Sequence, residues 1–219
     1  MSAQRELHDF FFKEAKRKGY RSRAAYKLSE IADKRNVLQK GDVVLDLGAA
    51  PGSWLQVVSE RIGEHGKVVG VDLKEIEEGL PFNVVTIQED VTLLTTEVLS
   101  SILGSNFRGF DSILSDMAPS TTGTKTVDHH GSVNLCHTAL DLSAKLLKPH
   151  GNLVMKVLEG EAYPELLKRS ANCFESAKGY KPKASRAIST EMFIVCLDRN
   201  EDMPKPLKPA PAPPTTGWN

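Results

Sequence analysis

The chain has 219 residues, of which 40% are hydrophobic, and its 28 basic and 28 acidic side chains give a formal net charge of zero. This length and composition fit one medium-sized domain whose core needs no disulfides or structural metal. The three cysteines form no CxxC pair and argue against a secreted disulfide framework, and no uncharged apolar run approaches the roughly 18 residues of a membrane-spanning helix. We therefore expect a cytoplasmic monomer, away from membranes, in which Cys136, Cys173 and Cys196 are buried thiols.

Basic residues are concentrated at the start of the chain. Residues 1–40 hold eleven Lys and Arg against five acidic residues, a net charge of +6 that the remaining residues balance. Two helices are expected here, at 7–18 and 22–36, with Gly19 as the break and Ser22 as the second N-cap. A basic helical arm of this kind indicates a nucleic-acid surface. The alternative, a transit peptide, is disfavoured because such peptides are poor in acidic residues.

Apolar strands and helices alternate from residue 42 onward. Strands are expected at 43–47, 68–73, 83–87, 110–116, 152–158 and 191–197. Helices are expected at 54–62, 92–103, 132–147 and 163–175. Because the strands are continuously apolar, this alternation predicts an α/β fold with a mostly parallel sheet and helices on both faces. The last strand follows a polar, basic stretch and is expected to pair at the sheet edge.

Proline dominates the end of the chain, with six prolines among the final sixteen residues. This composition predicts a disordered or polyproline-like tail at 199–219. We therefore divide the chain into a basic helical arm at 1–40, which is part of the same domain, a main domain at 41–198, and the tail.

The segment VVLDLGAAPGSW at 43–54 runs from a strand through a glycine-bearing turn into a helix. An open α/β sheet binds its ligand beyond the carboxyl ends of its strands, and Gly48 and Gly52 would let the backbone approach that ligand closely. The spacing is neither GxGxxG nor that of a P-loop, so a dinucleotide pyrophosphate is a poor fit. Asp72, at the end of the second strand, is placed to accept hydrogen bonds from two ribose hydroxyls of an adenosine, and Asp90 could accept from the adenine amino group.

These residues also have plainer interpretations. Asp72 and Asp90 taken singly are equally well explained as loop acids that cap helices, although together with the glycine turn they favour cofactor binding. Trp54 follows the turn directly and is more often a core residue, but its indole or backbone N–H could serve the ligand.

A lysine lies inside the apolar strand NLVMKVL at 152–158. Lysine is rarely buried without a partner, so Lys156 marks a functional site, reaches the strand end, or forms a structural ion pair with Asp116. Lys27 in the second helix, Asp116 at the end of the fourth strand and Glu191 at the start of the last complete a candidate catalytic group.

Six segments together resemble the FtsJ/RrmJ family of ribosomal RNA 2′-O-methyltransferases. They are DLGAAPGSW (46–54), VDL (71–73), SDMAPSTTGT (115–124), VDHH (127–130), VMKVLEGE (154–161) and SRAISTEMFIVC (185–196). The resemblance runs from about residue 10 to residue 198. It implies a Rossmann-like methyltransferase fold with a seven-stranded sheet, S-adenosylmethionine (SAM) as cofactor and a uridine of large-subunit ribosomal RNA as substrate.

The resemblance also assigns roles to single residues. It implies Lys156 as the central catalytic residue, assisted by Lys27, Asp116 and Glu191. The residues that it implies in cofactor binding are Gly52, Trp54, Asp72, Asp90 and Asp116. The sequence departs from the family at Ser53, where a second glycine is usual and where a positive φ would be costly, and in the acidic run at 74–78.

The implied reaction needs a ribose 2′-hydroxyl that is aligned with the electrophilic methyl carbon of SAM and relieved of its proton. We expect Lys156 to act as general base or to orient the hydroxyl. We expect Lys27 and Glu191 to position the ribose, and Asp116 to hold Lys156.

RNA is expected to contact the basic arm and a second basic stretch. The candidate phosphate contacts in that stretch are Lys178, Lys181, Lys183 and Arg186, and the candidate stacking residues are Tyr20, Tyr26 and Tyr180. His129 and His130 are expected in a loop, and no metal site is expected because two adjacent histidines lack further ligands.

Three other functions stay open. A transfer-RNA or messenger-RNA-cap 2′-O-methyltransferase would share the same four catalytic residues. A non-catalytic ribosome assembly factor that binds SAM and RNA would be free to lose them, so their presence argues against it. A small-molecule methyltransferase is disfavoured by the basic arm.

Overall fold

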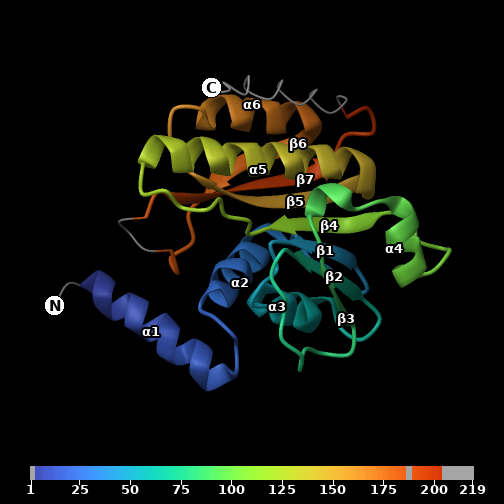
Figure 1. The fold of residues 1–219 in the computed structure, drawn as a ribbon, viewed down its shortest axis with the longest axis horizontal. Helices are drawn as coiled ribbons and strands as arrows, with labels where there is room; N and C mark the ends of the chain where they lie inside the picture. The colour runs from blue at the N-terminus through green and yellow to red at the C-terminus, as the bar shows by residue number, and fades with distance from the viewer. Residues whose placement is uncertain (1–2, 186–188, 204–219) are drawn as a thin grey trace, which may run out of the picture.

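The computed structural model describes residues 3–185 and 189–203, with side chains from residue 10 onward. One sheet of seven strands organises these residues, in the order β3-β2-β1-β4-β5-β7-β6 (Figure 1). The strands are β1 (Val43–Leu47), β2 (Lys67–Asp72), β3 (Val84–Gln88), β4 (Phe110–Ser115), β5 (Leu147–Leu158), β6 (Phe174–Tyr180) and β7 (Glu191–Arg199). The first five strands pair in parallel, and β7 runs antiparallel to both of its neighbours. The predicted α/β fold with a mostly parallel, seven-stranded sheet is confirmed.

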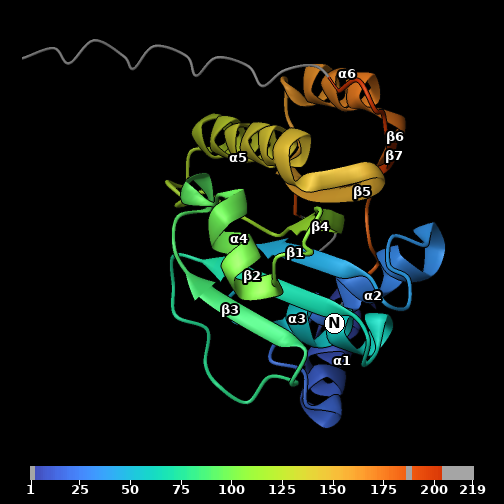
Figure 2. The ribbon, with the colours of Figure 1, turned by 90° about the vertical axis from the view of Figure 1, so that its right-hand side faces the viewer.

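Helices cover both faces of the sheet (Figures 1 and 2). They are α1 (Ala3–Lys18), α2 (Ala24–Arg35), α3 (Ser53–Ile62), α4 (Thr96–Leu103), α5 (Lys125–Leu146) and α6 (Tyr163–Cys173), with a short 3₁₀ helix, η1 (Val91–Leu93). Side chains alternate along β1, so that Leu45 and Leu47 pack in the core under α4, α5 and α6, and Val44 packs in the core with α2 and α3. Burial on both faces explains why β1 is continuously apolar.

The sheet reverses its direction of growth at β1, which lies between β2 and β4. Crossovers from neighbouring strands leave on opposite faces at such a point, and the crevice at the carboxyl ends of the strands is where open α/β sheets bind ligands. The glycine-bearing turn after β1 lies at this crevice.

The order of the last two strands differs from the prediction. β7 lies between β5 and β6, and β6 forms the edge, whereas the sequence predicted the last strand at the edge and a helix end followed by a loop at 174–180. The segment FESAKGY was missed because an edge strand exposes much of its surface and so has no continuous apolar run.

Two local predictions were also wrong. α5 begins at Lys125, so His129 and His130 lie on a helix and not in a loop. The N-cap of α2 is Arg23, and Ser22 precedes it by one residue and accepts a hydrogen bond from the Ala24 N–H. The predicted break at Gly19 is confirmed by its φ of 74°.

The three cysteines are buried free thiols, as predicted. No helix of the described residues is both long and apolar enough to cross a membrane. Arg186 and residues 204–219, which hold most of the predicted tail, lie outside the described residues.

Candidate active site

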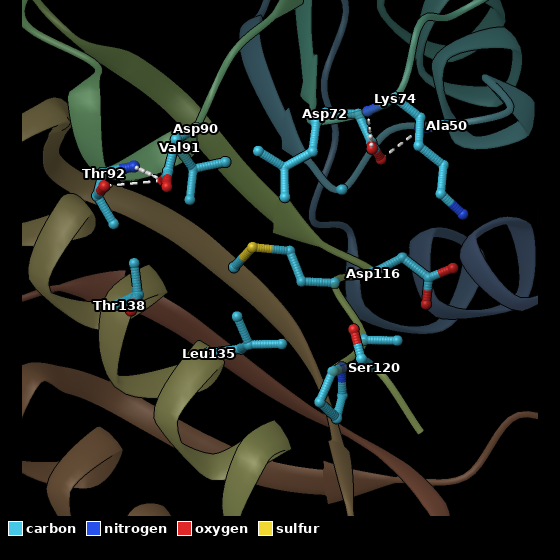
Figure 3. A pocket seen from close by; sticks show the side chains of 15 residues that line it. Ala50, Asp72, Lys74, Asp90, Val91, Thr92, Asp116, Ser120, Leu135 and Thr138 are labelled. Carbon is cyan, nitrogen blue, oxygen red and sulfur yellow. Dashed lines mark hydrogen bonds between the residues drawn. The ribbon is translucent and has the colours of Figure 1, made fainter. Parts of the chain in front are cut away.

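A pocket of about 570 Å³ opens at the carboxyl ends of the central strands. This volume lies within the range of roughly 300–1,000 Å³ that is usual for small-molecule sites. The predicted site residues that line it are Gly48, Asp72, Asp90 and Asp116. Figure 3 shows Asp72 between Ala50 and Lys74, and Asp90 beside Thr92. These four residues, which the sequence predicted as cofactor contacts, therefore lie together around one pocket.

Gly48 gives the first turn of the pocket its shape. Its φ is +75°, and a Cβ at this position would lie 2.9 Å from backbone atoms of Met117. Its N–H donates to the carbonyl of Val71 at 2.8 Å, which fixes the turn against β2. Glycine is needed here both for its backbone conformation and for the close approach of the loop after β4.

The carboxylate of Asp72 links two walls of the pocket. Its Oδ2 accepts from the Ala50 N–H at 3.0 Å and its Oδ1 accepts from the Lys74 N–H at 2.8 Å. These bonds orient the carboxylate and use one lone pair on each oxygen, so a further lone pair on each oxygen is left to accept from a ligand hydroxyl.

Asp90 both caps a helix and lines the pocket. Its Oδ1 accepts from the N–H and the hydroxyl of Thr92, at 2.8 and 2.7 Å, and it is the N-cap of η1. These two bonds lower the pKa of the Asp90 carboxyl, so it is ionised at neutral pH. Within the described structure both bonds use Oδ1, which leaves Oδ2 as an acceptor for a ligand.

Gly52 and Trp54 lie outside the lining of the pocket. Gly52 is the N-cap of α3 with a φ of +102°, so the positive φ falls on Gly52 and not on Ser53, which is the first residue of α3. The Trp54 side chain is 2% exposed, and its indole N–H donates to the Ala24 carbonyl at 2.9 Å. The indole is therefore a core group, and the alternative that it contacts the ligand is corrected.

Lys156 and Asp116 form an ion pair at the same end of the sheet. The distance from Lys156 Nζ to Asp116 Oδ1 is 2.9 Å, and Nζ also donates to the Asp116 carbonyl at 2.5 Å. The side chains are 12% and 21% exposed, so both are largely shielded from water without being sealed off. Because Asp116 also lines the pocket, this pair places the Lys156 ammonium at the pocket's edge.

Lys27 and Glu191 form a second ion pair. Lys27 Nζ lies 2.7 Å from both oxygens of the Glu191 carboxylate, which also accepts from the Ser185 hydroxyl at 2.8 Å. Burial alone would raise the pKa of Glu191, but the charge and hydrogen bond of Lys27, the Ser185 bond and the charge of Lys156 together leave it lowered.

The two ion pairs share one face of the sheet. Lys156 on β5 is in register with Phe193 on β7, and Lys27 Nζ lies 5.9 Å from the centre of the Phe193 ring. The structure thus brings together all four predicted catalytic residues, from α2, the end of β4, β5 and β7.

The sequence interpretation missed two residues of the site. Ser185 orients Glu191, and only its place in the segment SRAISTE hinted at this. Asp46 on β1 is fully buried, and neither carboxylate oxygen has a hydrogen-bond partner among the described residues. Burial, and then the charges of Asp116 and Asp72, raise the pKa of Asp46 well above its ordinary value. Its position as the first residue of DLGAAPG was the available signal.

The first helix of the basic arm, α1, projects from the body of the molecule beside α2 (Figure 1). Its exposed basic residues on α1 are Lys13, Lys16, Arg17 and Lys18. Tyr20 and Tyr180 donate their hydroxyls to Glu60 and Glu30, at 2.7 and 2.6 Å, so both rings are tethered within the protein and are poor candidates for stacking on a base.

His129 is a buried structural residue. Its Nδ1 lies 2.7 Å from the Leu158 carbonyl, and its Nε2 accepts from the Ala162 N–H at 3.0 Å. The ring therefore links α5 to the end of β5 and to the segment that follows it. In the described ranges no group of three or more His, Cys, Asp or Glu side chains is placed to hold a metal ion.

The chain is similar to known proteins in sequence and in structure. The family described as FtsJ-like methyltransferase matches residues 20–199. A protein of Methanosarcina mazei named ribosomal RNA large subunit methyltransferase E is 43% identical over 194 residues, which cover 87% of this chain and 69% of that protein. A protein of the same name from Methanobrevibacter smithii is 41% identical over 191 residues, which cover 87% of this chain and 90% of that protein. The crystal structure of a ribosomal RNA methyltransferase from Plasmodium falciparum matches with a TM-score of 0.73 and 30% identity, over 82% of this chain and 98% of that chain.

Proposed function

Because the chain belongs to the FtsJ-like methyltransferase family and is an RNA methyltransferase, we propose that it transfers a methyl group from SAM to a ribose 2′-hydroxyl, at a uridine of large-subunit ribosomal RNA. The observation that supports this most is Asp116, which is a lining residue of the pocket and forms the ion pair with Lys156. Asp116 thereby connects the proposed cofactor site to the lysine that would act on the ribose hydroxyl.

The pocket suits SAM in size and in its donor and acceptor groups. Asp72 would accept from the two ribose hydroxyls of the adenosine, and Asp90 from the adenine amino group. Gly48 would let the ligand lie against the backbone of the turn. When bound, SAM supplies an electrophilic methyl carbon, and Asp116 would border it.

Lys156 is assigned the task of assisting deprotonation of the 2′-hydroxyl. The Lys156 ammonium donates one hydrogen bond, to the Asp116 carbonyl, and forms an ion pair with the Asp116 carboxylate, so donor capacity is left for the ribose oxygen. A neutral Lys156 would accept the hydroxyl proton as general base, and a protonated Lys156 would stabilise negative charge that develops on the oxygen. The Lys27–Glu191 pair would position the ribose on the other side.

The basic arm is assigned to RNA binding. Its exposed lysines and arginine face solvent on α1, and the arm continues into α2, which carries Lys27 in the site. An RNA strand whose phosphates bind along α1 would thus be directed toward Lys27 and the ribose-binding side of the pocket. Phe10 and Phe12 are 56% and 60% exposed on the same helix and offer flat surfaces for unpaired bases.

The reaction is tested by transfer of labelled methyl from SAM to total RNA and to isolated ribosomal subunits, followed by alkaline digestion. We expect label in an alkali-resistant dinucleotide from large-subunit RNA, because a 2′-O-methyl group blocks cleavage at its own phosphodiester. Lys156→Ala should reduce transfer by about 10²–10⁴-fold, the usual contribution of a positioned acid or base. The matched control is Lys168→Ala, an exposed lysine on α6.

Each other outcome has a defined meaning. Near-normal turnover by Lys156→Ala, with normal SAM binding, would remove Lys156 from the chemistry. Label in transfer RNA or in messenger-RNA caps would replace the ribosomal substrate. SAM binding without transfer to any RNA would favour the non-catalytic assembly factor.

A further inference from the structure

The segment that joins α1 to α2, residues 19–23, is bonded to the start of α3; we call this segment the arm linker. Gln56 on α3 accepts from the Arg21 N–H through Oε1 and donates to the Gly19 carbonyl through Nε2, both at 2.9 Å. Ser22 donates its hydroxyl to Ser53 Oγ at 2.8 Å. The arm linker is therefore fixed to the helix that begins directly after the cofactor turn.

The Arg21 side chain extends this connection to the pocket walls. Its Nη1 donates to the Pro51 carbonyl at 2.8 Å. Its Nη2 donates to the carbonyls of Glu77 and Glu78, at 2.8 and 2.6 Å. Pro51 belongs to the turn after β1, and Glu77 and Glu78 belong to the loop after β2, so one guanidinium joins the two loops.

Both loops form walls of the cofactor pocket. Ala50 of the turn lines it, and so does Lys74 of the loop. Asp72 joins the same two walls at the ligand side, through the N–H groups of Ala50 and Lys74. Arg21 joins them at their other end, through carbonyls, so the walls are held at two points.

The contacts of Arg21 suit this role better than a phosphate contact. Its positive charge places it among the basic residues of the arm, but its two terminal nitrogens donate to three carbonyls. The guanidinium packs on the turn so closely that a Cβ on Gly52 would lie 3.0 Å from Nη1. A planar fork of donors can bridge several carbonyls at once, which the single ammonium of lysine does poorly.

We propose that Arg21 is a positioning residue for the cofactor: it sets the spacing of the two pocket walls, and its task is not to bind RNA phosphates. The inference rests on the proposed function, since it takes SAM as the ligand of the pocket. It predicts that a basic residue of the arm controls cofactor affinity.

The test compares Arg21→Lys and Arg21→Gln with the wild-type protein. SAM affinity is measured by titration calorimetry, RNA affinity by fluorescence anisotropy, and folding by thermal melting. We expect the Kd for SAM to rise about tenfold in both variants, because lysine keeps the charge but loses the fork. The KM for SAM should rise with it, while kcat at saturating SAM and the RNA affinity of Arg21→Lys stay within about twofold of the wild type.

Arg61→Gln is the matched control, because it removes an arginine on α3 that pairs with Asp33 and touches neither pocket wall. Its Kd for SAM should not change. Wild-type SAM affinity in Arg21→Lys, or a loss confined to RNA affinity, would overturn the inference. A wild-type protein that fails to bind SAM would overturn the proposed function, and this inference with it. If Arg21→Gln melts far below the wild type, the inference is judged on the Kd for SAM of Arg21→Lys alone.

Discussion

The two lysines of the site are held in different ways. Lys156 is bound by the carboxylate and the carbonyl of one residue, Asp116, so its position follows from the end of β4. Lys27 is bound by Glu191, which is held in turn by Ser185, so its position depends on the packing of α2 against the start of β7. The Lys27–Glu191 pair is therefore the one whose geometry depends on how a helix packs against a distant strand.

Glu191 should make folding stability depend on pH. Its folded pKa is lowered, since Lys27, Ser185 and Lys156 outweigh the effect of burial. The pair therefore stabilises the fold above the ordinary glutamate value of 4.5, and this stabilisation is lost as the pH falls through the lower, folded value. We expect Glu191→Gln to melt below the wild type at neutral pH, and the difference to shrink as the pH falls below 4.5.

Thermal melting of both proteins across this pH range is the measurement. Glu175→Gln, which changes an exposed glutamate on β6, serves as the control and should melt with the wild type throughout. A Glu191→Gln difference that stays constant down to the lowest pH would show that this carboxyl does not titrate with folding.

Sequence reasoning predicted single residues best where their chemistry is unusual for their surroundings. Lys156 stood out as a charge in an apolar strand, and its pairing with Asp116 was anticipated. The Lys27–Glu191 bond joins residues 164 positions apart, and no local pattern reports such a contact. Trp54 shows the limit most clearly, because an indole N–H needs a partner in either place and the sequence does not say whether that partner is a ligand or the carbonyl of Ala24.

At the scale of elements, the turn after β1 both packs against the loop after β4 and lines the proposed cofactor pocket. Gly48 and Gly41 both have a positive φ, of +75° and +86°, but only Gly48 has neighbours within 4 Å of an added Cβ. Gly41→Ala should therefore cost about 1 kcal/mol of backbone strain. Gly48→Ala should cost about 1–3 kcal/mol more, because its Cβ would meet the Met117 backbone, and it should also weaken SAM binding.

Urea unfolding of the two variants, with SAM titration in parallel, separates strain from contact. The shared positive φ makes Gly41→Ala the internal control. Equal losses of unfolding free energy in both variants would mean that the loop after β4 moves away freely, and that the close approach of Met117 does not shape the pocket.

Strands with a continuous apolar run were predicted well, including β3 at one edge of the sheet, whereas β6 at the other edge was not. The five parallel strands are apolar along most of their length, which identified each of them. β6 was missed, and β7 was placed at the edge, because an edge strand such as FESAKGY needs apolar residues on few of its positions. The order of β7 and β6 depends on which strand fills the space beside β5, and this is decided by tertiary packing.

At the scale of the whole molecule, charge is distributed unevenly although the net charge is zero. The triple variant Lys13→Ala, Lys16→Ala and Lys18→Ala should weaken RNA binding and make it less dependent on salt. Each lost phosphate contact lowers the slope of log K against log salt by about 0.7–0.9. SAM affinity should not change, because none of the residues that line the pocket belongs to α1.

RNA affinity measured by anisotropy at several salt concentrations gives this slope. A second triple variant, Arg108→Ala, Lys145→Ala and Lys168→Ala, removes the same charge from exposed positions elsewhere. If both triple variants changed the slope equally, the effect would come from net charge and not from the arm.

The place of β7 between β5 and β6 has a consequence for the order in which the protein matures during its synthesis. The strands, turns and loops that line the pocket are all complete by Thr138, whereas Glu191 enters the sheet only when β7 pairs with β5. In a nascent chain that emerges N-terminus first, the residues that line the pocket are therefore synthesised some fifty residues before Glu191, the partner of Lys27. On the proposed mechanism catalytic competence therefore comes after the pocket, because a chain that stops before β7 would hold every pocket residue and still lack Glu191, the proposed partner of Lys27 in positioning the ribose.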